Sequence, residues 1–474
     1  MSIPSPMFFV TAINIIFIIF VIVVQRRNTA ATWAWVVGIA LVPIAGFIVY
    51  MIIGQDSRKQ KVFLKKSEED DKLLTAYQGL GANEGETTNN NRITLYHDGV
   101  VKFDALLNDI ANAEKTIFIQ YYILRGDEAG ETLINALAQR AKDGLEVRLL
   151  IDGMGCSATP KDMYQPLLDA GGKLALFLPP VPVRINFRNH RKIAVIDGTV
   201  AYLGGSNIGM EYLGRKERFG NWRDTHMRLT GGAVAPLTLR FIMDWNFSAE
   251  KARTRSLFPK FPKHRRFIKL LKKTVTEMSV NPAYFPPSSG QAGANISIVS
   301  SGPDTVYPYV LHGFCRMIME ARKTIYIQSP YFVPDDALFT ALRIAALSGV
   351  DVRIMYPANP DHPFVYWAGS SYVGELMCAG VKGYEYTNGF LHSKTIMIDS
   401  KVCSVGTANM DVRSFKINFE TQAFIEDIAI TQELEDAFRR DMEDCRALTL
   451  ETYNQRKSIV KIKESISRLF SPLI

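Results

Sequence analysis

The spacing His-x-Lys-x-x-x-x-Asp occurs twice in this chain, and each copy is followed by small residues and then an asparagine. The two sets are His190, Lys192, Asp197 and Asn207, and His392, Lys394, Asp399 and Asn409. Longer stretches repeat as well, since residues 113–120 read Ala-Glu-Lys-Thr-Ile-Phe-Ile-Gln and residues 321–328 read Ala-Arg-Lys-Thr-Ile-Tyr-Ile-Gln. A repeat of this length is a duplicated domain, because the units of solenoid arrays are much shorter. We therefore expect two similar lobes that build one site.

Within each copy, apolar runs of strand length alternate with longer helical patterns. Residues 116–121 and 147–151 have the length and composition of strands, and residues 131–142 between them have the pattern of a helix. This alternation predicts an α/β layer architecture. We place lobe one at residues 93–250 and lobe two at residues 292–474.

The first fifty residues are far more apolar than the rest of the chain. Residues 7–24 form an apolar run of 18 residues, which spans ~27 Å as a helix. Residues 31–53 form a second run. Two such runs in tandem predict a transmembrane hairpin within residues 1–54, rather than buried core helices or a cleaved signal peptide.

Basic residues near these runs predict the orientation of the hairpin. Two arginines, Arg26 and Arg27, lie in the connection, whereas five lysines and arginines follow the second run between residues 58 and 66. Cytoplasmic flanks carry the excess of positive charge. We therefore expect a cell-membrane protein with two spans and a cytoplasmic catalytic domain.

Three further segments differ in composition from the lobes. Residues 55–92 are polar and predict a neck that is partly helical and then, over residues 79–91, a loop. Residues 251–291 form a connector whose first part, 251–273, is rich in Lys and Arg without acidic residues; an anionic lipid surface and a solvated linker both fit it. The end of the chain, from residue 456, has the pattern of an amphipathic surface helix.

The net charge of +8 and the cysteine content limit the partners. This charge suits nucleic acid or an anionic membrane surface. The predicted spans favour anionic membrane lipids, so we expect no nucleic acid partner. The five cysteines lack metal-ligand spacing and suit a reducing compartment, where buried small apolar side chains are their expected role.

Each motif predicts a β-hairpin that gathers its polar residues. His190 and Lys192 stand at the start of a strand-like run, Asp197 and Gly198 form a turn signal, and the returning strand 200–203 leads to Asn207. The second copy repeats this pattern. Histidine offers a nucleophile or acid, lysine a fixed cation and asparagine an amide donor, which together suit a phosphate.

Four carboxylates have supporting roles in this hypothesis. Asp197 and Asp399 belong to the motifs but lie in the turns, where we expect them to hold the site rather than attack. Asp224 and Glu420 follow their motifs closely and are candidates for orienting the imidazoles, with surface carboxylates as the alternative.

The duplicated motif resembles that of the phospholipase D superfamily from about residue 93 to the end. The predicted N-terminal transmembrane hairpin is similar to that of bacterial cardiolipin synthases. It contains Ala-Thr-Trp-Ala-Trp at 31–35 and Pro-Ile-Ala-Gly-Phe at 43–47. The resemblance implies two lobes, each a mixed sheet flanked by helices, related by a pseudo-twofold around one active site. It also implies that no metal or other cofactor is used, and the sequence contains no HExxH, EF-hand or zinc pattern.

By the same resemblance, one histidine attacks phosphorus to give a phosphatidyl-histidine, and the other protonates the leaving glycerol and later deprotonates the incoming alcohol. We assign His190 as nucleophile and His392 as acid and base. Lys192, Lys394, Asn207 and Asn409 would stabilise the five-coordinate phosphorus.

The expected reaction joins two phosphatidylglycerols into cardiolipin and releases glycerol. The alternatives are a phospholipase D-type hydrolase that uses water, a nuclease of the same superfamily, and a catalytically silent membrane scaffold. The predicted transmembrane hairpin disfavours the nuclease, because it places the site beside lipid. The completeness of both motifs disfavours the scaffold.

Overall fold

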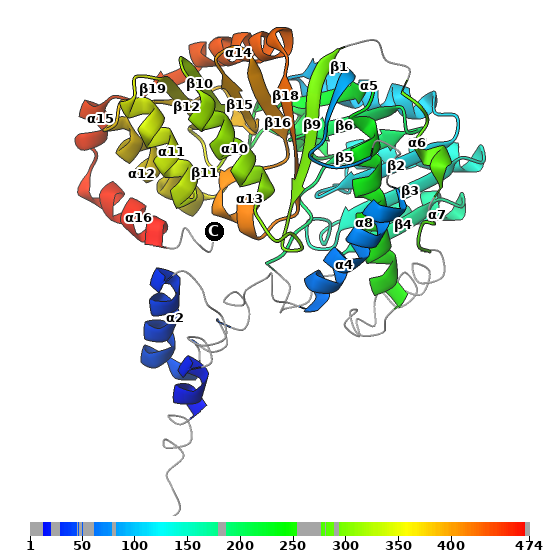
Figure 1. The fold of residues 1–474 in the computed structure, drawn as a ribbon, viewed down its shortest axis with the longest axis horizontal. Helices are drawn as coiled ribbons and strands as arrows, with labels where there is room; N and C mark the ends of the chain where they lie inside the picture. The colour runs from blue at the N-terminus through cyan, green and yellow to red at the C-terminus, as the bar shows by residue number, and fades with distance from the viewer. Residues whose placement is uncertain are drawn as a thin grey trace, which may run out of the picture.

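The computed structural model of the chain describes residues 13–19, 29–44, 46, 50, 61–77, 82–178, 186–253, 276–279, 281–288 and 293–469. Most of them belong to a body built around a single large sheet (Figure 1). Its strand order is β19-β13-β12-β10-β15-β16-β18-β9-β1-β8-β6-β5-β2-β3-β4.

The first half of the body runs from β1 to α8. Its strands are β1 (Thr87–Tyr96), β2 (Thr116–Tyr121), β3 (Glu146–Asp152), β4 (Lys173–Phe177), β5 (Ile193–Ile196), β6 (Val200–Gly204), β7 (Trp222–Arg223) and β8 (His226–Thr230). Its helices are α5 (Gly99–Ala111), α6 (Glu128–Lys142), α7 (Gln165–Asp169) and α8 (Val234–Arg253).

The second half runs from β9 to α16. Its strands are β9 (Ala294–Ser301), β10 (Thr324–Gln328), β11 (Phe332–Val333), β12 (Asp351–Pro357), β13 (Lys382–Tyr386), β14 (Phe390–Leu391), β15 (Thr395–Ile398), β16 (Val402–Gly406), β17 (Met410–Asp411), β18 (Glu420–Glu426) and β19 (Cys445–Ala447). Its helices are α10 (Tyr309–Glu320), α11 (Asp336–Leu347), α12 (Pro363–Met377), α13 (Val412–Lys416), α14 (Ile428–Glu443), α15 (Leu450–Asn454) and α16 (Ser458–Leu469).

The two halves repeat one strand order outward from the centre of the sheet. The order β1-β8-β6-β5-β2-β3-β4 corresponds to β9-β18-β16-β15-β10-β12-β13, and β1 pairs with β9 in antiparallel fashion where the halves meet. In each half three outer strands are parallel, as in β2 with β3, and the inner ones are antiparallel, as in β2 with β5. In the second half β19 adds an antiparallel strand at the edge of the sheet. The predicted class, a duplicated α/β fold with mixed sheets and helical layers, is confirmed.

Alternation along the strands builds a core on each face of the sheet. Ile117 and Ile325 point to one face, and their neighbours Phe118 and Tyr326 point to the other, because side chains alternate along a strand. The first face is covered by α5 to α7 in one half and α10 to α12 in the other. The second face is covered by α8, α14 and the neck helix α4 (Lys61–Ala76) in one continuous core.

The predicted strands and helix of the first lobe named above agree with the structure, whereas part of the predicted neck differs. The strands at 116–121 and 147–151 and the helix at 131–142 are present as β2, β3 and α6. The expected loop at 79–91 is wrong in its last part, because β1 begins at Thr87. Asn91 caused the error: a turn-forming residue in sequence, it is buried here and its amide donates to Thr88 and Ala294.

The N-terminal segments that are described pack against one another. Residues 13–19 are helical and α2 (Thr29–Leu41) follows them. The Asn14 amide donates to the Ile39 carbonyl at 3.2 Å, and the Tyr50 ring makes edge contacts with Phe17 and Trp35. Much of the predicted spans 7–24 and 31–53 lies outside the described residues, as does most of the basic connector. Among the helices that are described, none has both the length and the apolar character needed to cross a bilayer.

Candidate active site

Two β-hairpins with left-handed turns carry the two motifs. Strand β5 pairs with β6, and β15 pairs with β16 in the same register. Asp197 and Gly198 have φ of 52° and 67°, the positive pair that a tight hairpin turn of two residues requires. Asp399 and Ser400 have φ of 53° and 52° in the second copy. Ser400 is held there by Glu435, which accepts from its amide and its hydroxyl.

The motif histidines and lysines precede these strands rather than lying within them. Strands β5 and β15 begin at Ile193 and Thr395, so the expectation that His190 and Lys192 stand at the start of a strand is corrected. The reason is that the preceding backbone pairs with the other half of the protein. The His190 amide donates to the Phe419 carbonyl at 3.0 Å, and the His392 amide donates to the Arg223 carbonyl at 2.7 Å.

These exchanged backbone bonds bring each histidine to a carboxylate of the opposite half. The Nδ1–H of His190 donates to Glu420 Oε1 and Oε2 at 3.0 and 3.1 Å. The Nδ1–H of His392 donates to Asp224 Oδ2 at 2.7 Å. Both carboxylates are buried. A hydrogen bond at Nδ1 fixes the tautomer, so Nε2 is the nitrogen left to react.

Burial and nearby lysines keep the imidazoles neutral. Burial, together with the charges of Lys192 and Lys394, outweighs Glu420 and lowers the pKa of His190 to about 4. Burial and Lys394 likewise lower the pKa of His392, against the effect of Asp224. Burial alone would raise the pKa of Asp224, but His392 and Lys394 lower it to about 2. Each pair is therefore a neutral imidazole on an ionised carboxylate.

Both lysines are tied to the histidine of their own motif. The ammonium groups of Lys192 and Lys394 each donate to the carbonyl oxygen two residues earlier at 2.6 Å. Nζ of Lys394 also lies 3.1 Å from His392 Nδ1. Burial lowers the pKa of Lys394 to about 8 and that of Lys192 well below its ordinary value. An anion beside these groups would favour their charged forms.

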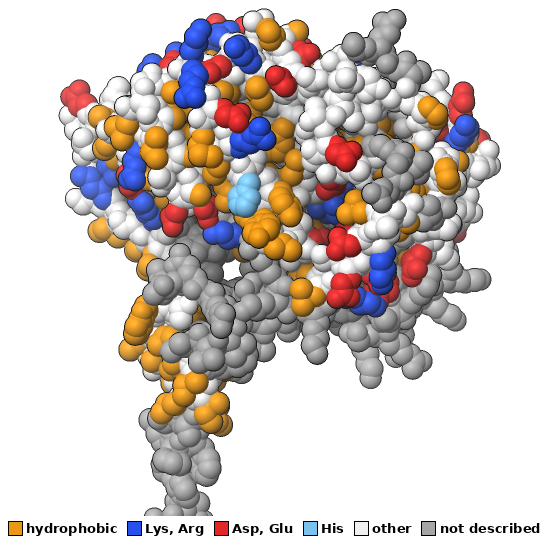
Figure 2. Space-filling view, viewed as in Figure 1, with side chains coloured by type: hydrophobic (Ala, Val, Ile, Leu, Met, Phe, Trp, Pro, Cys, Tyr) orange, Lys and Arg blue, Asp and Glu red, His pale blue; other side chains and the backbone are white. Residues whose placement is uncertain are grey.

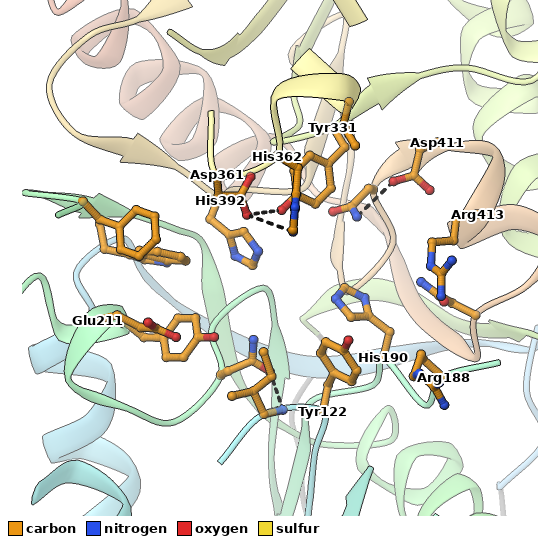
Figure 3. A pocket seen from close by; sticks show the side chains of 18 of the residues that line it. Tyr122, Arg188, His190, Glu211, Tyr331, Asp361, His362, His392, Asp411 and Arg413 are labelled. Carbon is orange, nitrogen blue, oxygen red and sulfur yellow. Dashed lines mark hydrogen bonds and ion pairs between the residues drawn. The ribbon is translucent and has the colours of Figure 1, made fainter. Parts of the chain in front are cut away.

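A cavity of about 790 Å³ opens between the halves, and both histidines line it. Both imidazoles point into it in Figure 3. Part of its wall is apolar, including Phe219, Trp222 and Phe364. Such a cavity has room for a polar head group beside lipid-like surface.

The two asparagines line the same cavity but are held differently. Asn207 Oδ1 accepts from the Ile123 amide at 3.1 Å. The Asn409 amide donates to Asp411 at 3.1 Å, and its Oδ1 has no hydrogen-bond partner among the described residues. The structure thus places Asn207 and Asn409 on the wall of the cavity that both histidines line.

Asp197 and Asp399 lie at the opposite end of the strands from the histidines. Asp197 accepts from the amides of residues 114, 115 and 116 at 2.7–2.8 Å. Asp399 accepts from residues 322, 323 and 324 at the same distances. Burial opposes ionisation of Asp399, but these amides outweigh it and lower its pKa. Neither carboxylate is among the residues that line the cavity.

Several residues that line the cavity were not predicted from the sequence. The ring of Tyr122 lies edge-on to His190 at 5.0 Å and under the Lys192 ammonium at 5.4 Å. The other lining residues with charged or hydrogen-bonding side chains that were not predicted include Arg125, Arg188, Glu211, Tyr212, Tyr331, Asp361, His362, Asp411, Arg413 and Asn418. Tyr122 and Tyr331 each lie shortly after a copy of the repeated Ile-Gln sequence, at 119–120 and 327–328. This repeat was the one sequence signal that could have indicated the two tyrosines. Within the described parts of the chain, no group of three or more His, Cys, Asp or Glu is placed to hold a metal ion.

Comparison with known proteins agrees with this architecture. The family model described as cardiolipin synthase, PLD-like domain, matches residues 106–218 and 314–442, and that of the phospholipase D-nuclease N-terminal region matches residues 12–55. The major cardiolipin synthase of Bacillus subtilis is 41% identical, with 100% of this chain and 99% of that protein covered. A cardiolipin synthase of Listeria welshimeri is also 41% identical, over 98% of this chain and 97% of that one.

A solved structure has the same fold as this chain. The crystal structure of phosphatidylserine synthase from Haemophilus influenzae superposes with a TM-score of 0.62 at 17% identity, covering 85% of this chain and 100% of that one. It shares the fold. With two repeats matched and relatives aligned from end to end, the chain belongs to the cardiolipin synthase family of phospholipase D-like enzymes.

Proposed function

We propose that this chain is a phosphatidyltransferase that joins two phosphatidylglycerols into cardiolipin and releases glycerol. One observation carries the proposal: two imidazole–carboxylate pairs, each formed by a histidine of one half and a carboxylate of the other, open on the same cavity. A single site with two histidines supplies a nucleophile and a separate acid and base for a two-step displacement. The full-length identity to cardiolipin synthases supports the choice of lipid.

In the first step, Nε2 of His190 attacks the phosphorus of phosphatidylglycerol. A P–N bond forms and the bond from phosphorus to the glycerol head group breaks. The leaving oxygen takes a proton from Nε2 of His392. The low pKa of His190 keeps its lone pair available, and Glu420 stabilises the positive charge that the ring acquires.

His392 must be protonated for this step, although burial lowers its pKa in the empty site. The phosphodiester anion supplies the missing charge, because a negative neighbour raises the pKa of an imidazole. Lys192, Lys394, Asn207 and Asn409 are proposed to stabilise the charge that develops on the phosphoryl oxygens. Asp197 and Asp399 are proposed to hold the two hairpins through backbone amides.

In the second step, a hydroxyl of another phosphatidylglycerol attacks the phosphatidyl-histidine. His392 takes the hydroxyl proton, the P–N bond breaks and His190 is regenerated. The apolar part of the cavity wall favours a lipid alcohol over water as the acceptor, because apolar side chains offer water no hydrogen bonds. One phosphodiester replaces another, so no nucleotide is needed.

Purified protein in phosphatidylglycerol vesicles tests this reaction. Cardiolipin and glycerol in equal amounts are the expected products. Phosphatidic acid as the main product would instead identify a hydrolase, and unchanged lipid would point to the catalytically silent scaffold or the nuclease.

We infer that the N-terminal segment anchors the enzyme in the cell membrane by two spans, with the catalytic body in the cytoplasm. The described N-terminal residues turn large apolar side chains outward, among them Ile16, Trp33 and Leu41. Cys378 is exposed on the body and reports on its side of the membrane. A membrane-impermeant maleimide should label it only after lysis; labelling in intact cells would contradict the cytoplasmic assignment.

We infer that the chain divides into five parts. These are the anchor at 1–54, the neck at 55–92, the first lobe at 93–250, the connector at 251–291 and the second lobe at 292–474. The neck helix α4 packs against α8, which supports a neck that is docked on the body. We propose that phosphatidylglycerol and other anionic membrane lipids are the partners of this protein.

A further inference from the structure

Helix α16 is amphipathic, but its apolar face points away from the protein body and its buried face carries polar residues. Four of its apolar residues, Ile459, Ile462, Ile466 and Leu469, are 56%, 53%, 48% and 75% exposed, and Val460 is half-buried. Its polar residues Glu464 and Ser467 are 2% and 0% exposed. A helix that only packs on a water-soluble body turns its apolar stripe inward. Here the stripe is left facing outward.

The inward face of α16 is held on α12 by polar and cation–π contacts. The Arg468 guanidinium pairs with Glu375 at 2.5 Å and lies over the Tyr372 ring at 4.4 Å. The Lys463 ammonium lies 4.6 Å over the Trp367 ring. These contacts fix which face points out, so the exposure of the stripe follows from the packing.

The exposed residues form one narrow stripe. Positions 459, 462, 466 and 469 fall within about 80° of the helix circumference, at about 100° per residue. Lys461 and Lys463 are exposed beside it, and Lys457 is exposed just before the helix. Apolar side chains bordered by lysines are the pattern of a helix that lies in the interface of an anionic bilayer.

The stripe is also connected to the mouth of the cavity. Phe364 lines the cavity and is 54% exposed, so the cavity opens at this residue. Phe364 belongs to α12 and its ring contacts Trp367, on which Lys463 rests. Figure 1 shows α16 on the same lower side of the body as α2, and hydrophobic side chains lie along that edge in Figure 2.

We propose that α16 lies in the surface of an anionic phospholipid bilayer, with Ile459, Ile462, Ile466 and Leu469 among the acyl chains. The helix thereby holds the mouth of the cavity at Phe364 against the layer that contains the lipid substrates. This inference deepens the proposed function and rests on its lipid substrates. It adds a second membrane contact that is independent of the N-terminal segment.

A pair of double variants with equal charge change tests the role of the stripe. I462E/I466E places two carboxylates in the stripe, whereas S458E/S465E places two at exposed polar positions of the same helix. With full-length protein and phosphatidylglycerol vesicles, I462E/I466E should reduce turnover about tenfold. Turnover on phosphatidylglycerol in detergent micelles should stay near the wild-type value, and S458E/S465E should change neither. Equal loss in vesicles and micelles, or no loss, would overturn the proposal.

A depth measurement decides the same question without turnover. An environment-sensitive fluorophore is attached to I462C, and separately to E443C at the exposed end of α14, with Cys315, Cys378 and Cys445 replaced by serine. Nitroxides on lipid acyl chains should quench the probe at 462 and not the probe at 443. An unquenched probe at 462 would overturn the membrane contact, even if wild-type protein makes cardiolipin. Quenching would support it, even if wild-type protein makes none and the proposed function fails.

A second copy of the chain is the main alternative occupant of the stripe. Light scattering of detergent-solubilised protein separates the two cases. An oligomer that I462E/I466E dissociates and S458E/S465E does not would assign the stripe to a subunit interface and overturn the proposal. An unchanged mass supports the bilayer.

Discussion

His190 and Glu420 form a hydrogen-bonded pair at 3.0 Å although 230 residues separate them in the chain. His392 and Asp224 form the reciprocal pair at 2.7 Å. Each half therefore supplies the histidine of one pair and the carboxylate of the other. Neither half contains a complete pair, so the site exists only when both halves are folded together.

Glu420→Gln and Asp224→Asn should each reduce turnover by on the order of a thousandfold, because the amide no longer stabilises the imidazolium. Steady-state turnover on phosphatidylglycerol measures the loss. Glu435→Gln is the matched control, since Glu435 is buried in the second half but contacts Ser400 and Arg439 rather than a histidine. Loss of activity in the control alone would contradict the assignment.

His190→Ala and His392→Ala should each abolish turnover of phosphatidylglycerol, because the two rings have different tasks in one site. A lipid phosphodiester with a nitrophenol leaving group separates these tasks, since nitrophenolate leaves without a proton. His392→Ala should then accumulate a covalent phosphatidyl adduct on residue 190, detected by mass spectrometry of peptides. An adduct on His392 in the His190→Ala variant would reverse the roles.

Asp197→Asn and Asp399→Asn should affect stability rather than chemistry. Each carboxylate accepts three backbone amides, and the neutral amide side chain cannot accept all of them. The expected cost is about 1–3 kcal/mol in the free energy of unfolding, measured by chemical denaturation. Turnover per folded molecule should be unchanged. Asp436→Asn, at an exposed position of α14, is the control.

Lys66→Met should destabilise the protein through three buried carboxylates. The Lys66 ammonium lies 2.6, 2.8 and 3.4 Å from Asp70, Asp304 and Asp244, which come from the neck, the second half and the first half. Removing the shared cation takes from Asp304 its ion pair and leaves Asp70 and Asp244 with Arg240 and Arg191 as their remaining cations, at a cost of about 3–5 kcal/mol. Lys65→Met is the control, because Lys65 is exposed and pairs with Glu250. Equal stability of the two variants would contradict this account.

Acidification should destabilise the fold, and His190 contributes to this loss over a defined pH window. The imidazole has a pKa of about 4 in the folded chain against 6.5 when unperturbed. Between these values the unfolded state binds the extra proton, so stability is complete above pH 6.5 and is lost as the pH falls to about 4. The loss from this group is on the order of 3 kcal/mol. His190→Gln should remove the share that belongs to this group and leave the shares of His97, His226 and His392, whose pKa values burial also lowers. His312→Gln, on the exposed face of α10, should leave the dependence unchanged.

The sequence by itself determined the duplication, the α/β class and the two hairpins that present the motifs. Periodicity and turn residues are local properties, so β2, β3, α6 and the Asp197–Gly198 turn could be predicted from neighbouring residues. The spacing within each motif also placed the histidine and asparagine at the same end of a hairpin. The repeat identified both copies without any knowledge of how they meet.

Only the tertiary structure decided the partners that come from different parts of the chain. The backbone bonds from His190 to Phe419 and from His392 to Arg223 cross between the halves, and sequence distance carries no information about them. The same is true of Lys66 and its three carboxylates. The outward face of α16 was also undecided in sequence, because an amphipathic pattern gives two faces and only the contacts with α12 select which one is buried. Long-range contacts depend on how the elements pack, and packing is settled by the whole fold rather than by any local pattern.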